Sequence, residues 1–172
     1  MEEKPLKSEF KRWERIDGVI YDMTPPPSSQ HQAIVESLYG EFYTYLKGKQ
    51  CKAYPAPFGV WLDDANDIYV EPDITIVCDH SKIHTKGCIG VPDLVVEDLS
   101  PSTALKDKRV KLKLYRLSGV LEYWIVDPFN QIMEVYRLSE NVFTEPQVYG
   151  KDETVTVGIF EDLEINLYDI FE

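Results

Sequence analysis

The order of hydrophobic and polar residues in the first third of the chain predicts a hairpin followed by a helix. Apolar residues flank Asp17-Gly18, a dipeptide typical of the tight turn between two short strands. Beyond a run of prolines, Ser28 or Ser29 can cap a helix that ends at Gly48. The apolar residues of its predicted buried face recur at steps of three and four: Ile34, Leu38, Phe42 and Tyr45.

The remainder of the chain has the pattern of strands interrupted by one more helix. The predicted segments are two or three strands in 52–77, a polar connection in 79–90, a strand in 92–100, a helix from Ser100-Pro101 to Gly119, and strands in 121–128 and 131–139. Helices and strands in this order predict an α/β (α+β) protein with a mixed central β-sheet flanked by helices. A chain of 172 residues is expected to form one domain, residues 1–172.

Charge limits how this protein can meet a nucleic acid. Its 30 acidic and 18 basic residues give a net charge of −12, so the molecule as a whole repels polyanions. Any binding to nucleic acid must therefore come from a local basic patch.

Cysteine use and the absence of long apolar runs indicate a cytoplasmic protein. Cys51, Cys78 and Cys88 are an odd number without close paired spacing, which argues for reduced thiols and against a structural zinc site. Residues 1–15 carry charges throughout and lack the apolar segment of a signal peptide. No apolar run is long enough to span a membrane, so we expect no membrane association.

Two acidic residues stand at the ends of apolar strands, where they are expensive to bury. Asp73 opens the strand of residues 73–77, and Glu97 closes the run Leu94-Val95-Val96. Removing a carboxylate from water costs several kcal/mol unless a cation or hydrogen-bond donors meet it. If the two strands are neighbours, both acids reach one edge of the sheet, where they form the kind of oxygen pair that holds Mg²⁺.

The helix after Glu97 carries a candidate partner for these acids. At 100° per residue, Asp107, Lys111 and Tyr115 fall on one flank of its apolar face, where the stem of Lys111 can be buried while its ammonium reaches the sheet. A basic cluster falls on the other flank and predicts a nucleic-acid-binding surface: Lys106, Arg109, Lys113 and Arg116. We therefore expect Glu97 to meet a metal ion, Lys111, or both.

Five separated blocks of the sequence resemble the Uma-two family of putative restriction endonucleases. The blocks are "ERIDG" (14–18), "PPPSSQHQAI" (25–34), "VEPDITIV" (70–77), "GVPDLVVEDLSPSTALKDKRVKLKLY" (90–115) and "GVLEYWIVDP" (119–128). The resemblance implies a restriction-endonuclease-like PD-(D/E)xK core. It also implies DNA as the substrate, phosphodiester hydrolysis as the reaction, and Mg²⁺, with Mn²⁺ as a substitute, as the cofactor.

The family pattern implies roles for individual residues of this chain. Asp73, from Pro72-Asp73, and Glu97 are implied as catalytic metal ligands together with the backbone carbonyl of Asp98. The usual lysine position holds Leu99, and the resemblance implies that Lys111 on the following helix replaces it. Residues implied to lie near the site are Glu14, His31, Asp107 and Tyr115. Asp98 departs from the family, which usually has an apolar residue there.

Each of these features also has a structural interpretation. An Asp after Pro is common in turns, and Glu97 with Lys111 can form a buried ion pair without catalytic meaning. The alternative function is a non-catalytic nucleic-acid- or protein-binding module on the nuclease fold. We also predict a homodimer, because the apolar strands 121–128 and 131–139 look too extensive for one subunit to cover.

Overall fold

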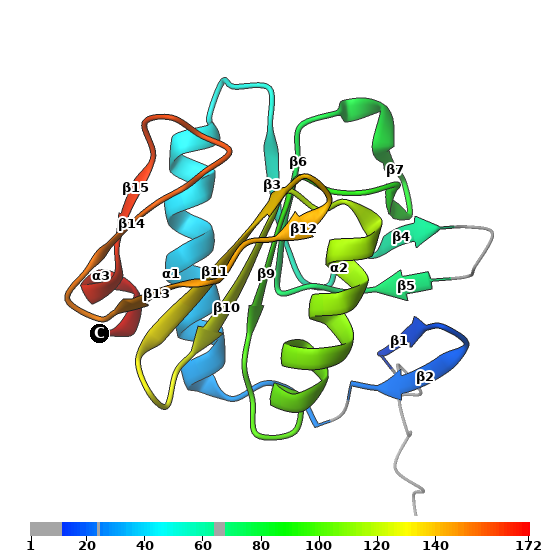
Figure 1. Cartoon of the computed structure of the whole chain (residues 1–172), viewed down its shortest axis with the longest axis horizontal. Helices are drawn as coiled ribbons and strands as arrows, with labels where there is room; N and C mark the ends of the chain where they lie inside the picture. Colours follow the sequence, from blue (N-terminus) through cyan, green and yellow to red (C-terminus); the bar gives the residue numbers. More distant parts are fainter. Residues whose placement is uncertain (1–11, 24, 64–67) are drawn as a thin grey trace, which may run out of the picture.

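The computed structural model describes residues 12–23, 25–63 and 68–172, and its central feature is a mixed sheet between helices (Figure 1). Its strands lie in the order β12 (Val142–Phe143), β11 (Ile132–Ser139), β10 (Glu122–Asp127), β9 (Leu94–Asp98), β6 (Ile74–Val77) and β3 (Lys52–Pro55), with β13 (Gln147–Gly150) also paired to β11. Strands β9 and β10 are parallel, and the other pairs of this sheet are antiparallel. The predicted class and the mixed sheet flanked by helices are confirmed.

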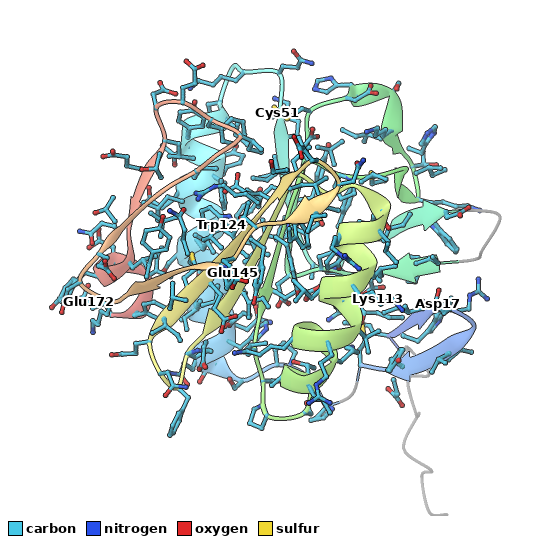
Figure 2. All side chains as sticks on the ribbon, in the orientation of Figure 1. Asp17, Cys51, Lys113, Trp124, Glu145 and Glu172 are labelled. Carbon is cyan, nitrogen blue, oxygen red and sulfur yellow. A yellow bond between two sulfur atoms is a disulfide. The ribbon has the colours of Figure 1, made fainter. Side chains whose placement is uncertain are left out.

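Helix α1 (Ser29–Leu46) covers one face of this main sheet. Ser28 caps it, because the Ser28 side chain accepts a hydrogen bond from the backbone N–H of His31. Ile34, Leu38 and Phe42 are buried as predicted, and the ring centroid of Phe42 lies 5.5 Å from that of Trp124 on β10. Figure 2 labels Trp124 in the main sheet. The cap therefore fixes where the first turn of α1, which carries His31, begins.

The opposite face is covered by a helix of two parts, η2 (Lys106–Lys111) and α2 (Leu112–Ser118). Gly119 ends α2 with φ +90°, as its position in the sequence predicted. Because side chains alternate along a strand, neighbouring residues of β9 face different helices: Val96 belongs to the α1 side and Val95 to the α2 side.

A second, smaller sheet packs beside α2. Its strands lie in the order β2 (Val19–Asp22), β1 (Trp13–Ile16), β5 (Ile68–Val70), β4 (Val60–Asp63), β8 (Gly87–Ile89) and β7 (Ile83–His84). The predicted hairpin around Asp17-Gly18 is β1–β2. The prediction of a polar connection over 79–90 was wrong in part, because β7 and β8 lie there beside the 3₁₀ turn η1 (His80–Lys82), and β8 pairs with β4. The chain closes with β14 (Thr154–Thr156), β15 (Glu164–Asn166) and α3 (Leu167–Phe171).

The structure corrects two further expectations. Cys51 and Cys78 are not reduced thiols but form a disulfide between neighbouring strands, and Cys88 is free and buried. The expectation of reduced thiols was wrong because Cys51 and Cys78, 27 residues apart in sequence, meet only through the β3–β6 register. The reason given for a homodimer is corrected in part, because β10 is buried within one subunit, with Tyr123 and Trp124 fully buried, whereas most of β11 is half-buried. The homodimer itself stays a prediction.

Among the described residues, no helix has both the length and the apolar character needed to cross a bilayer. The charged segment 1–15, on which the absence of a signal peptide was judged, lies mostly outside the described residues. Cytoplasmic location stays a prediction.

The packing of α1 leads to a stability prediction. Phe42 is fully buried against Trp124, whereas its neighbour Tyr43 is 50% exposed. We expect Phe42→Ala to lower the free energy of unfolding by about 3–5 kcal/mol, because it leaves a cavity against the sheet. Tyr43→Ala should change it by about 0.5 kcal/mol or less. Urea unfolding monitored by circular dichroism measures both, and equal effects would show that α1 does not pack through this face.

Candidate active site

Strands β6 and β9 bring three acidic residues to one end of the main sheet. The register pairs Ile74 with Val96, which places Asp73, just before β6, level with Glu97 near the end of β9. The backbone N–H of Asp98 donates a hydrogen bond of 2.7 Å to Asp73 Oδ2. The strand order therefore brings Asp73, Glu97 and Asp98 together, as the sequence predicted for the first two.

Lys111 meets Glu97 inside the protein. Its Nζ lies 2.6 Å from Glu97 Oε1, 2.8 Å from Glu14 Oε1 and 3.6 Å from Asp107 Oδ1, and only 2% of its side chain is exposed. The Tyr115 hydroxyl donates a second hydrogen bond, of 3.0 Å, to Glu97 Oε1. One oxygen of Glu97 is thus held by two donors from the same helix.

The local winding of the helix explains how these groups enter the interior. Residues Lys106–Lys111 form a π-helix, in which backbone hydrogen bonds join residues five apart, and α-helical winding resumes at Leu112. Asp107 and Lys111 are the buried residues of this segment. The Tyr123 hydroxyl, from β10, donates a hydrogen bond to the backbone carbonyl of Asp107. The sheet therefore fastens the same segment that carries Lys111.

Glu14 on β1 joins this cluster from the small sheet. Its Oε1 also accepts a hydrogen bond from the backbone N–H of Glu71, and its Oε2 lies 2.8 Å from Lys106 Nζ. Burial raises the pKa of the Glu14 carboxyl, but Lys111 and Lys106 outweigh it and hold this pKa at about 2. Lys106, whose side chain is 12% exposed, is therefore a counter-ion of Glu14, and its place in a nucleic-acid-binding surface stays a prediction.

The α1 side of the site contains His31 and Asp98. His31 Nε2 lies 3.3 Å from Asp73 Oδ2 and 3.8 Å from Asp98 Oδ2. Burial raises the pKa of Asp98 to about 8, although His31 acts in the opposite direction. Burial lowers the pKa of His31, but Asp73 and Asp98 reverse this and raise it overall. Among the described residues, neither carboxylate oxygen of Asp98 has a hydrogen-bond partner.

The site as a whole has more negative than positive groups. Its carboxylates are Glu14, Asp73, Glu97, Asp98 and Asp107, and its cations are Lys106 and Lys111, with His31 as the third when protonated. Burial raises the pKa of Glu97 despite Lys111, while the carboxylates around Lys111 raise its pKa although burial opposes them. The arrangement is therefore suited to taking up protons or a further cation.

The donor set fits a magnesium ion. Over residues 12–23, 25–63 and 68–172, no three His, Cys, Asp or Glu side chains are arranged to hold a metal among themselves. Mg²⁺ does not need three, because it keeps several waters and is bound through one or two carboxylates. Asp73 and Glu97 supply these two, and the unpartnered oxygens of Asp98 mark the local shortage of positive charge.

The structure brings together most, but not all, of the predicted site residues. Each of the four residues implied to lie near the site contacts Asp73, Glu97 or Lys111: Glu14, His31, Asp107 and Tyr115. Arg109 and Lys113 instead line a separate hollow of about 720 Å³ between α2 and the β1–β2 hairpin, and Figure 2 shows Lys113 on α2 and Asp17 on that hairpin.

Sequence reasoning missed the side chain of Asp98 and the inward turn of Lys106. The only sequence indication for Asp98 was its departure from the family pattern.

The second Pro-Asp pair, Pro92-Asp93, lies away from this site. Asp93 Oδ2 accepts a hydrogen bond of 2.7 Å from the backbone N–H of Cys78, and Asp93 precedes β9 at the end opposite Glu97. We interpret Pro92-Asp93 as the start of a strand and not as the Pro-Asp pair of the nuclease motif, and these contacts agree with that interpretation.

Comparisons with known proteins point to one family. The model of the Uma2 family, described as "Putative restriction endonuclease", matches residues 3–168. "Uncharacterized protein slr1290" of Synechocystis sp. (strain ATCC 27184 / PCC 6803 / Kazusa) is 28% identical over 142 residues, which cover 77% of this chain and 74% of that protein.

A solved structure shares the fold. It is the crystal structure of "a putative nuclease belonging to DUF820" from Anabaena variabilis ATCC 29413, with a TM-score of 0.75 and 25% sequence identity over 92% of this chain and 89% of that one. The match to the family model covers the strands and helices that build the site. The chain therefore belongs to the Uma2 family of restriction-endonuclease-like proteins.

Proposed function

We propose that this protein is a metal-dependent endonuclease that hydrolyses DNA phosphodiester bonds. The observation that carries the proposal is the end of the main sheet, where Asp73 and Glu97 lie level on neighbouring strands and Lys111 is buried against Glu97. The family and the structural neighbour, both described in terms of nucleases, support it.

Asp73 and Glu97, with the backbone carbonyl of Asp98, would hold the ion, which supplies a Lewis acid for the phosphate and a bound water of lowered pKa. Of the two side chains Asp73 is the more accessible, 17% exposed against 5% for Glu97. The substrate phosphate would therefore approach from the side of Asp73 and His31. His31, which is 14% exposed, is positioned to hold a proton near that approach.

Lys111 acts in this proposal by positioning Glu97. With 2% of its side chain exposed and three carboxylates around it, its ammonium does not reach a phosphate in this arrangement. It instead compensates the buried charge of Glu97, while Tyr115 fixes the same oxygen. A lysine in the catalytic position of this superfamily is expected to orient the metal-bound water or to stabilise charge on the phosphoryl oxygens, and the burial of Lys111 among carboxylates instead favours this positioning role.

One observation favours the alternative, a non-catalytic nucleic-acid- or protein-binding module. Lys111 has its carboxylate partners within the protein, so the ion pair is complete without any ligand. Cleavage of a substrate by the wild-type protein with Mg²⁺ or Mn²⁺ separates the two functions, because a binding module does not hydrolyse DNA.

The proposal predicts that metal binding depends on one of the two Pro-Asp pairs and not on the other. Asp73→Ala and the double variant Asp73→Ala, Glu97→Ala should abolish Mn²⁺ binding measured by calorimetry and plasmid cleavage. Asp93→Asn, the matched control in the other Pro-Asp pair, should retain both. Mn²⁺ affinity that survives the double substitution would refute the site.

Removal of Lys111 is expected to destabilise the protein. Lys111→Met leaves Glu97 buried without its cation and leaves Glu14 with Lys106 alone, which should cost about 3–5 kcal/mol of unfolding free energy. Mn²⁺ should reduce this loss, because a bound cation again compensates Glu97. Lys113→Met, an exposed change on the same helix, should cost about 0.5 kcal/mol or less. Denaturant unfolding with EDTA or Mn²⁺ tests this, and a Lys111→Met protein as stable as the wild type would contradict the ion pair.

The raised pKa of Asp98 predicts a pH dependence in the absence of metal. The folded protein binds a proton at Asp98 up to about pH 8, whereas the unfolded chain loses it near the ordinary value of 3.8. A raised pKa contributes stability below the unfolded value that is lost as pH rises through the folded one. The melting temperature in EDTA should therefore fall between pH 5 and pH 8 more steeply for the wild type than for Asp98→Asn. Parallel curves for the two proteins would exclude Asp98 as the group responsible.

A further inference from the structure

The outer face of the small sheet carries three aromatic side chains on three neighbouring strands. Trp13 on β1, Tyr69 on β5 and Trp61 on β4 are half-buried, while the residues between them along each strand point into the core. The ring centroids of Trp13 and Tyr69 are 5.1 Å apart, and those of Trp61 and Tyr69 are 4.6 Å apart. We call this continuous row the aromatic platform.

The platform lines a hollow of about 500 Å³. Its central ring, Tyr69, is held by the backbone at Gly59 and by hydrogen bonds through Glu71. A Cβ on Gly59 would lie 2.7 Å from the Tyr69 ring, so only glycine lets this ring pack against the backbone there. The Tyr69 hydroxyl donates to Glu71 Oε1, and Arg12 Nε donates to Glu71 Oε2, each at 2.7 Å. The central ring is therefore fixed before any ligand binds.

The charges around the platform differ in sign from those of the whole molecule. Arg12 and Lys86 line the hollow, and the Arg15 guanidinium lies 5.5 Å from the Trp13 ring centroid. Among the described residues, the acids on this face are Glu71, which is paired with Arg12, and Asp22, which lies opposite Trp13 on β2. The described residues of this face thus carry three cations and two acids, a balance of +1, on a protein whose net charge is −12. Aromatic faces framed by cations suit a ligand with planar rings and anionic groups.

We propose that the aromatic platform binds single-stranded nucleic acid by stacking its bases. Stacking on aromatic side chains, with cations along the backbone, is the usual means of holding single strands without reading their sequence. A neutral glycan also stacks on aromatic rings but gains nothing from the cations. This inference extends the proposed function by naming single-stranded nucleic acid as the form of the substrate. It rests on the proposed function only in that respect.

The platform is close enough to the candidate active site for one strand to use both. Tyr69 precedes Asp73 by only four residues, so their Cα atoms lie at most about 14 Å apart. Along β1, Trp13 faces the platform whereas Glu14 faces Lys111. A single strand stacked on the platform can therefore continue around this edge toward Asp73.

Intrinsic fluorescence tests the proposal directly, because two of the three tryptophans lie on the platform and Trp124 is fully buried. We expect a 12-nucleotide oligo(dT), in EDTA, to quench the wild-type emission. Trp61→Ala should weaken its affinity about tenfold, as expected for one lost stacking contact. Trp61→Phe should retain most of the affinity. Lys86→Ala, an exposed change in the β7–β8 turn, should weaken binding and reduce its salt dependence without affecting folding.

The controls separate failure of this inference from failure of the proposed function. Tyr43→Ala removes an exposed aromatic residue on α1 and should leave the affinity unchanged. Absence of quenching, or unchanged affinity in both Trp61→Ala and Lys86→Ala, would overturn the proposal that the platform binds single strands, even if duplex DNA is still cleaved with Mn²⁺. Binding that survives Asp73→Ala, with no cleavage by the wild type, would support the platform and contradict the nuclease. A loss of self-association in Trp61→Ala, seen by sedimentation without any change in oligonucleotide affinity, would overturn the platform and assign this face to a second copy of the chain.

Discussion

The buried ion pair between Lys111 and Glu97 is the interaction on which the rest of the site depends. Each of the two charges would cost several kcal/mol to bury alone, so each requires the other, and Glu14 and Asp107 also surround the ammonium. The arrangement ties three separate parts of the fold together: β9 of the main sheet, the π-helical segment after it, and β1 of the small sheet. The small sheet is therefore part of the site, since it provides one of the carboxylates that hold the lysine.

The alternation of side chains along two strands organises the chemistry of the molecule. On β9, Glu97 points toward Lys111 on the α2 side, while Asp98 lies near His31 on the α1 side, and Asp73 contacts the backbone between them. On β1, Glu14 joins the buried cluster, whereas Trp13 lies on the outer face. Two short strands thus distribute charged groups to the interior and an aromatic surface to the outside.

Asp98 is the residue that the family resemblance marked as a departure, and its surroundings show what a carboxylate does at this place. A buried carboxylate with no hydrogen-bond partner among the described residues favours its neutral form, and its pKa of about 8 reflects this. A nearby cation reverses that preference. An acid at this position therefore makes the α1 side of the site more responsive to pH and to positively charged ligands than an apolar residue would.

The sequence by itself determined the local elements and part of the site. The Asp17-Gly18 turn, the Ser28 cap and the end of the helix at Gly119 follow from preferences of a few adjacent residues, and the helical period placed Lys111 beside Tyr115. Only the tertiary structure decided which distant groups meet: Glu14 with Lys111, Cys51 with Cys78, and Trp13 with Tyr69. Periodicity reports which face of an element is buried but not which strand lies next to it. These contacts depend on strand order and on a π-helical segment that turns Lys106 inward, and neither leaves a pattern in the residues nearby.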